Sequence, residues 1–182
     1  MKSIRMWMAV VVAMLCLVNG IAEAQDKSGF GVNVGVGISQ VKDRDGSESF
    51  NANDIGYIMG GEYRFNENFA IGFNVFGLGS PEDEFNSVNT TIEVRGADLV
   101  LRFILPVADG VELFGLAGTA AYKADLEPGG TNGLFGEDAV ELGLGADLGS
   151  GENFAFRLAG RYFDGPRDES GALITIGFNY RF

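Results

Sequence analysis

The sequence alternates between apolar and polar or small residues over most of its length, and this period of two constrains the fold most strongly. The pattern is clearest at the C-terminal end, where every second residue is apolar: Ala172, Ile174, Ile176, Phe178, Tyr180 and Phe182. The residues between them are small or polar, among them Gly177, Asn179 and Arg181. Successive side chains of a strand point to opposite faces of a sheet. This stretch therefore predicts a β-strand with one apolar face and one polar face.

Eight segments of the chain share this alternation. They are residues 30–38, 55–65, 69–76, 97–103, 114–122, 140–148, 154–162 and 172–182. In the fifth segment the apolar phase includes Phe114, Leu116 and Tyr122, although the opposite face is also uncharged. The sequence thus predicts an all-β protein of eight strands.

The connections between these segments alternate in length. The short ones span residues 66–68, 104–110 and 149–153, and the long ones span residues 39–54, 78–90, 123–138 and 163–171. Transmembrane barrels have short turns at one end and longer loops at the other, whereas a β-sandwich gives no reason for this alternation. After residue 24 no segment is long and apolar enough to form a membrane-spanning helix, so a bilayer would be crossed by strands. We expect an eight-stranded antiparallel up-and-down transmembrane β-barrel.

The N-terminal residues 1–24 have the layout of a cleaved secretory signal peptide. Lys2 and Arg5 precede an apolar run over residues 6–18, and residues 22–24 form a small-x-small cleavage site. The expected domains are therefore a signal peptide over residues 1–24 and a barrel over residues 25–182. A lipoprotein signal at Cys16 is disfavoured because the preceding Leu15 is not small. A retained helical anchor is disfavoured because the run is shorter than the ~20 residues that span a bilayer.

Composition excludes several classes of function. The chain has 13 Lys and Arg against 25 Asp and Glu, for a net charge of −12, and such a surface would repel the phosphates of a nucleic acid. It has no His, and its one Cys lies in the predicted signal peptide. Ser-His hydrolysis, thiol nucleophiles and His-ligated metals are thereby excluded.

The acidic clusters of the chain fall on predicted loops. Residues 82–84 and 164–169 carry several carboxylates, but a catalytic pair needs an enclosed site to separate its two pKa values. Residues 43–48 resemble a calcium-binding loop only faintly, since they lack the terminal bidentate Glu. We expect no enzyme activity, no cofactor and no metal centre. The favoured interpretation is that these acidic loops join divalent cations, which bridge them to phosphate groups.

Charged residues alternate with the apolar face, so the charged face must be the inner one if the apolar face meets lipid. The lumen is expected to hold an ion-pair network of Glu62, Arg64, Asp98, Arg102, Glu141, Asp147, Arg157, Arg161 and Arg181. The turn at Gly151 predicts a register that puts Glu141 opposite Arg161 and Asp147 diagonal to Arg157. Buried charges without partners are costly; the simpler alternative is that a few of these residues face lumenal water.

Aromatic residues on the apolar face gather near the two ends of the predicted strands. Those near the short turns are Phe30, Tyr63, Phe65, Phe69, Phe103, Phe114 and Phe154, and those near the long loops are Tyr57, Tyr122 and Tyr162. Aromatic girdles at the two membrane interfaces are typical of transmembrane barrels.

With its C-terminal Phe182 preceded by Tyr180, Phe178 and Ile176, the chain resembles the eight-stranded outer-membrane barrels of Gram-negative bacteria. That group contains the OmpA transmembrane domain, OmpX and the opacity proteins. The turns at residues 65–69 and 151–154 also resemble periplasmic hairpins of the family. The resemblance implies an outer-membrane location and implies that Ile176, Phe178, Tyr180 and Phe182 are recognised by the outer-membrane assembly machinery. Function varies within the group.

Three hypotheses of function follow. The leading one is a structural role in envelope integrity, with adhesion through acidic surface loops at residues 42–54, 80–90, 124–138 and 164–171. The alternative is a narrow passage for ions or small apolar molecules, and the third is a soluble exported ligand binder. The expected partners are outer-membrane lipid, lipopolysaccharide, the assembly machinery and a surface ligand. We expect a monomer with no peptidoglycan-binding domain after Phe182.

Overall fold

Strands make up nearly all of the described chain. The computed structural model describes residues 28–45, 48–85, 88–127, 137–149, 153–166 and 169–182. The predicted signal peptide, residues 1–24, and the turn at Gly151 lie outside these residues. Among them, no helix has the length and apolar character to cross a membrane. The strands are β1 (Gly29–Asp45), β2 (Glu48–Arg64), β3 (Phe69–Gly77), β4 (Glu82–Phe85), β5 (Val88–Ala108), β6 (Val111–Glu127), β7 (Glu137–Leu148), β8 (Phe154–Asp164) and β9 (Ser170–Arg181).

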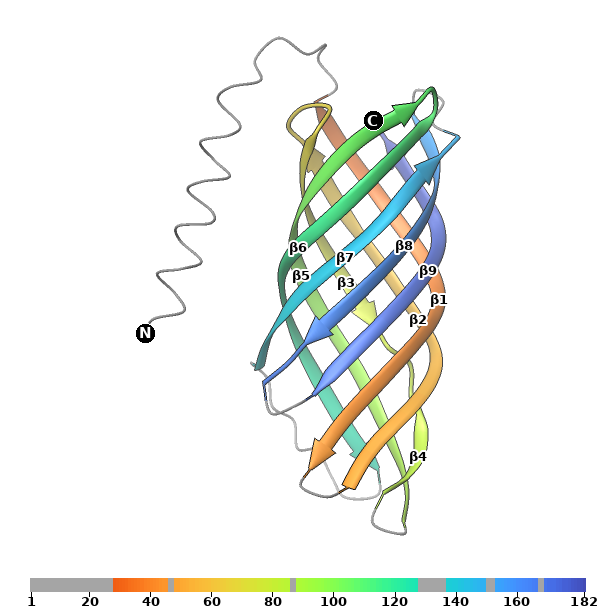
Figure 1. The fold of residues 1–182 in the computed structure, drawn as a ribbon, viewed down its shortest axis with the longest axis vertical. Coiled ribbons are helices and arrows are strands. Elements are labelled where there is room, and N and C mark those ends of the chain that lie inside the picture. Colours follow the sequence, from red (N-terminus) through yellow and green to blue (C-terminus); the bar gives the residue numbers. More distant parts are fainter. Residues whose placement is uncertain (1–27, 46–47, 86–87, 128–136, 150–152, 167–168) are drawn as a thin grey trace, which may run out of the picture.

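All neighbouring strands pair antiparallel, and the sheet closes on itself. Its order is β3-β2-β1-β9-β8-β7-β6-β5-β4, and a further pairing of β3 with β5 completes the ring. Both β3 and β4 pair with β5, so they are one barrel strand interrupted at residues 78–81. The predicted fold, a closed eight-stranded antiparallel barrel, is confirmed. Figure 1 shows the tilted strands with the short turns at the upper end and the β4 hairpin at the lower end.

The strands are longer than the sequence pattern predicts. β1 and β2 remain paired up to Asp45 and Glu48, and β4 and β5 remain paired up to Phe85 and Val88. The expected surface loops at residues 42–54 and 80–90 are therefore mostly paired strand, which is a correction. β6 also continues to Glu127. As a result, the wall of β1, β2, β4, β5 and β6 extends further past the barrel than β7, β8 and β9 do (Figure 1).

Burial alternates along the strands as predicted, with the apolar face outside. Phe30, Leu144 and Phe182 are among the most exposed side chains, at 67%, 72% and 76%. The charged and small residues of the same strands are buried in the lumen. In a bilayer the outward apolar side chains contact acyl chains, and the closed ring of strands leaves no unpaired backbone edge in the hydrocarbon.

The predicted phase of the fifth segment, which forms β6, is wrong. Phe114 and Leu116 are both 5% exposed and face the lumen, whereas Leu113 is 43% exposed and faces outward. Tyr122 packs against the buried apolar residues of the lumen. Both faces of this segment are uncharged, so the alternation itself does not distinguish inside from outside. The ring of Phe114 makes cation–π contacts with the guanidinium groups of Arg102 and Arg157. These contacts favour the inward position of the ring.

Candidate functional site

The lumen holds an ion cluster at the short-turn end, built from Arg64, Glu112 and Arg181. Arg64 Nη1 lies 3.0 Å from Glu112 Oε2, and Arg181 Nη2 lies 2.6 Å from the same oxygen. Arg64 also donates hydrogen bonds to the backbone carbonyls of Asn66 at 2.9 Å and Glu67 at 2.5 Å. One guanidinium therefore fastens the first short turn to the inside of the barrel.

The middle of the lumen is filled by Glu62, Arg102, Asp147 and Arg157. Arg157 makes a bidentate pair with Asp147, with Nε–Oδ1 at 2.7 Å and Nη2–Oδ2 at 2.8 Å. It also contacts Glu62, and Arg102 pairs with both carboxylates. The guanidinium carbons of Arg102 and Arg157 lie 4.0 and 5.2 Å from the ring centre of Phe114. Such cation–π contacts strengthen when water is excluded.

A third cluster, nearer the loop end, contains Asp98, Glu141 and Arg161. Arg161 Nη1 lies 3.1 Å from Asp98 Oδ2 and 2.7 Å from Glu141 Oε1. Asn74 donates to Asp98 Oδ1 at 2.6 Å and accepts a hydrogen bond from Asn33 at 3.2 Å. These polar side chains come from β1, β3, β5, β7 and β8, so the cluster spans the lumen from wall to wall.

All nine residues predicted for the lumen lie there, and together with Glu112 they form the lumen network. In the described chain this network contains five arginines and five carboxylates: Arg64, Arg102, Arg157, Arg161 and Arg181 with Glu62, Asp98, Glu112, Glu141 and Asp147. Equal numbers of opposite charges suit a buried site, since an unpaired buried charge is strongly unfavourable.

Glu112 is the member that sequence reasoning missed. It shares its phase with Phe114, two residues along the same strand. A phase that turns Phe114 toward lipid also turns this carboxylate outward near the membrane, and that conflict was a signal for the opposite phase.

The register of β7 and β8 differs from the prediction by two residues. Asp147 lies directly opposite Arg157, and Glu141 lies opposite Phe163 and therefore diagonal to Arg161. The pair predicted to be diagonal, Asp147 and Arg157, is thus directly opposite, and the pair predicted to be opposite, Glu141 and Arg161, is diagonal. A shift of two residues preserves the face of every side chain, which is why the same residues still meet.

Apolar side chains fill the lumen on the loop side of the lumen network, and we call them the apolar plug. Phe76 and Phe163 stack with ring centres 4.6 Å apart and an interplanar angle of 22°. Ile58, Leu78 and Leu173 are buried in the same group. The remaining members are Val41, Ala52, Ile92, Val94, Ala120 and Ala139. The lumen is thus filled first by charges and then by apolar groups.

Aromatic residues predicted for the girdle lie on the outer surface at the short-turn end. Neighbouring rings touch there, with ring centres 4.8 Å apart for Phe30 and Tyr63 and 5.5 Å apart for Phe69 and Phe103. Phe65 and Phe154 are exposed on the same band. At the loop end Tyr57 and Tyr162 are exposed. Phe114 and Tyr122 are excluded from the girdle because both face the lumen.

The four C-terminal residues expected to be an assembly signal face outward. Ile176, Phe178, Tyr180 and Phe182 are all exposed on the outer surface, and the Tyr180 and Phe182 ring centres are 5.1 Å apart. Within the described residues no group of three or more carboxylates is placed to hold a metal ion.

Comparison with known proteins identifies the family. The family described as Outer membrane protein beta-barrel domain matches residues 8–182. None of the curated proteins compared matches the chain.

Solved structures with the same fold include Neisserial surface protein A, with a TM-score of 0.65, 15% identity, and coverage of 85% of this chain and 98% of that one. OprG from Pseudomonas aeruginosa gives a TM-score of 0.59 at 13% identity, over 88% of this chain and 99% of that one. Ail, the attachment invasion locus protein of Yersinia pestis, gives 0.55 at 20% identity, over 85% and 99%. With the closed barrel and its apolar outer face, these matches show that the chain belongs to the outer membrane protein beta-barrel domain family and resides in the bacterial outer membrane.

Proposed function

We propose that this protein is a closed, non-enzymatic barrel that supports the integrity of the outer membrane. The observation that carries the proposal is the filled lumen, in which the apolar plug lies directly beyond the lumen network. A barrel of eight strands is only wide enough for its own side chains. Permanent filling of this kind suits a structural element of the membrane.

The competing function is a passage for ions or small apolar molecules. Such a molecule would have to cross both the lumen network and the apolar plug. An ion would have to separate buried pairs such as Arg157 and Asp147, and each separation leaves an uncompensated buried charge. It would then have to pass the stacked rings of Phe76 and Phe163. We therefore favour the structural role over the passage.

We further propose that the long-loop end of the barrel displays an acidic surface beyond the membrane. This end includes the acidic wall, by which we mean the extended ends of β1, β2, β4, β5 and β6. The outward side chains change from apolar at Ile38 and Ile55 to polar at Lys42 and Asn53, which marks the outer edge of the hydrocarbon. In each of the segments 42–54, 80–90, 124–138 and 164–171, acidic residues outnumber basic ones. Such a surface favours divalent cations that bridge to lipopolysaccharide phosphates, or a cationic surface ligand.

The charge of this wall argues against one kind of adhesion. One Ail structure contains the heparin analogue sucrose octasulfate. A polyanion of that kind would be repelled by the acidic wall of this chain. An adhesive role here accordingly calls for a partner of opposite charge or for bridging cations.

The exposed C-terminal residues support a further proposal about assembly. Alternating aromatic and aliphatic side chains up to Phe182 are accessible on the outer face, and we propose that the assembly machinery binds them. The proposed assembled form is a monomer, because the ring of strands is already closed.

Two measurements test the structural role. Planar-bilayer recordings of the purified barrel should show no steady conductance. A deletion strain should leak a normally excluded dye, and the intact protein should restore the barrier. A steady open current, or a barrier unaffected by the deletion, would contradict the proposal.

A matched variant removes the paired strand ends that extend past the membrane and keeps the barrel itself. Lys42 and Asn51 are direct partners, as are Glu82 and Thr91. An Asn-Gly turn can therefore replace residues 43–50 and residues 83–90 while the register is kept. This shortened protein should still restore the barrier, but it should lose attachment to cells or to cation-bridged lipopolysaccharide. Loss of the barrier with the wall would assign the envelope role to the wall instead.

A further inference from the structure

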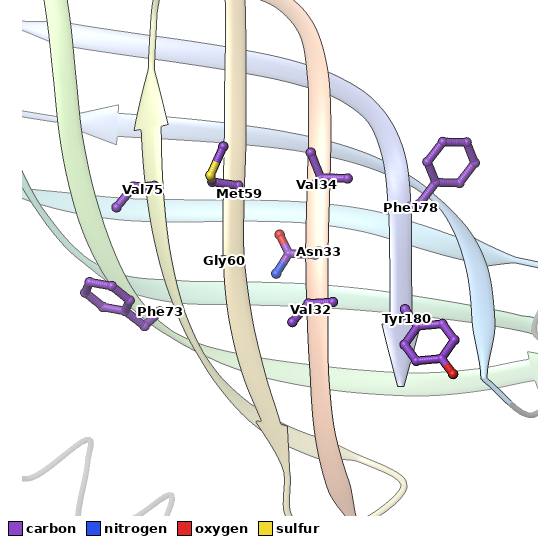
Figure 2. Close-up of a pocket in the computed structure, with 9 residues that line it drawn as sticks. All are labelled: Val32, Asn33, Val34, Met59, Gly60, Phe73, Val75, Phe178 and Tyr180. Carbon is purple, nitrogen blue, oxygen red and sulfur yellow. The ribbon is translucent and has the colours of Figure 1, made fainter. Parts of the chain in front are cut away.

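A hollow of about 560 Å³ lies on the outer surface of the barrel, in the half nearer the short turns. Figure 2 shows its lining from four neighbouring strands. The outward side chains around it are Val32, Val34, Met59, Phe73, Val75, Phe178 and Tyr180. Its site on the lipid-facing wall separates it from the lumen.

One outward position beside the hollow has no side chain. Gly61 lies directly between Val32 on β1 and Phe73 on β3, and its neighbours along the outward row of β2 are Met59 and Tyr63. Added to Gly61, a Cβ would meet only the Gly31 carbonyl oxygen, at 3.7 Å. The backbone therefore does not require glycine here, and a larger side chain would lie between Val32 and Phe73, which both line the hollow.

The surface of the hollow is apolar along its length, with one hydroxyl at its periplasmic end. Asn33 contributes to the floor, but its carboxamide points into the lumen and donates to Asn74. Tyr180 lies near the end of β9, at the level of the aromatic girdle. Tyrosine at such a position places its ring in the apolar region and its hydroxyl in the wet interface.

We propose that this hollow seats one acyl chain of a phospholipid of the periplasmic leaflet, with its headgroup on the Tyr180 side. The wall around the hollow already faces the hydrocarbon of the membrane, so the hollow is continuous with the lipid interface. A concave apolar surface gives a chain more dispersion contacts than a flat one. Apart from Tyr180, the lining offers no polar side chain that would orient a protein partner. The inference is independent of the proposed structural role.

Photo-crosslinking in proteoliposomes tests the site. Phosphatidylethanolamine would carry a diazirine either near the carboxyl end or near the methyl end of one acyl chain, and labelled peptides would be mapped by mass spectrometry. The first probe should label Tyr180 and Val32 preferentially, and the second should label Met59 and Val75. Equal labelling all around the barrel would show bulk lipid only and would overturn the proposal. An exchange of the two labelling patterns would indicate an acyl chain from the opposite leaflet and would also overturn the proposal.

Two matched glycine variants sharpen the test. Gly61→Leu adds an apolar side chain at the edge of the hollow, between Val32 and Phe73, and should reduce labelling at Val32 and Met59 several-fold. Gly160→Leu is the control, because Gly160 also faces outward, on β8, and a Cβ there has no heavy atom within 4 Å. It should leave labelling unchanged.

The heat-modified gel shift confirms that each variant is folded. Unchanged labelling in a folded Gly61→Leu variant would overturn the proposal. With a photoreactive residue placed at Met59 instead of in the lipid, cross-links that join two copies would also overturn it, since the occupant would then be a second barrel.

Discussion

Two arginines of this chain show that the contribution of an arginine to stability depends on whether it is buried or exposed. Arg157 is buried between Asp147, Glu62 and the ring of Phe114. Arg95 pairs with Glu93 on the outer wall, where the arginine side chain is 66% exposed. Water solvates the exposed pair in any conformation, whereas the carboxylates around Arg157 depend on it for compensation.

We expect Arg157→Met to lower the free energy of unfolding by about 3–5 kcal/mol, because it removes the bidentate partner of Asp147 and leaves one buried carboxylate charge of the central cluster uncompensated. Urea unfolding in lipid vesicles, followed by the heat-modified gel shift, measures the change. Arg95→Met is the matched control, and its unfolding curve should nearly coincide with that of the unchanged protein. Equal effects of the two substitutions would show that the lumen is hydrated rather than closed.

The inward position of Phe114 gives a second prediction at the residue scale. The sequence contains a single Trp, Trp7, which is lost if the signal peptide is cleaved, so an introduced Trp is an unambiguous probe. Lipids brominated on their acyl chains should quench the fluorescence of Leu113→Trp strongly and that of Phe114→Trp little. Stronger quenching of Phe114→Trp than of Leu113→Trp would show that Phe114 faces the lipid, as the alternation alone predicts.

At the scale of elements, the ladder between β2 and β3 ends before the barrel wall does. The last pair is Tyr57 with Gly77, and beyond it side chains connect the β1–β2 hairpin to the chain leading into β4. The Asp54 carboxylate accepts hydrogen bonds from Ser80 N at 2.6 Å and Ile55 N at 2.7 Å. Gly79, with φ of 76°, lies so close to this carboxylate that a Cβ there would collide with it.

We expect Asp54→Ala to release the β4–β5 hairpin without unfolding the barrel. The amide of Ser80 loses its acceptor, so hydrogen exchange at Ser80, and through it in β4, should become faster by at least tenfold, which corresponds to about 1.4 kcal/mol of local stability. Asn53→Ala is the control, because Asn53 is exposed on the outer face. Unchanged exchange at Ser80 would show that the β5 pairing alone holds this hairpin.

At the scale of the whole molecule, two unlike layers close the same lumen. The lumen network lies toward the short turns and the apolar plug toward the loops, so either layer alone can block passage. A barrel of this size has no space for a continuous water column once one layer is filled.

Conductance of layer variants tests this arrangement. Replacing Phe76 and Phe163 by Ala should leave the barrel closed, and replacing Asp98, Glu141 and Arg161 by Ala should do the same. The combined variant should also stay closed, because the cluster of Glu62, Arg102, Asp147 and Arg157 still fills the middle of the lumen; its gel shift checks that the barrel is folded. Steady current through the first variant would mean that the lumen network is permeable.

Much of this protein is determined by the sequence itself. The period of two defines the strands and separates the lumen arginines from outward residues such as Leu144, because strand geometry assigns alternate residues to opposite faces wherever the faces differ in charge. The alternation of short and long connections defines the up-and-down order. Local chemistry is sufficient for both features.

Tertiary structure decided the features that depend on neighbours distant in the chain. Phe114 and Glu112 lie inside because Arg102, Arg157 and Arg64 approach them from other strands. The two faces of residues 114–122 are both uncharged and contain no such information, and Glu112 is the one local signal for this phase. The two-residue shift between β7 and β8 follows from the packing around the closed barrel, since either register keeps the same faces. The strands continue past the membrane because their inner side still buries residues of the apolar plug, such as Val41 and Ile92. Burial against distant partners is the physical reason in each case, and a pattern of period two does not encode it.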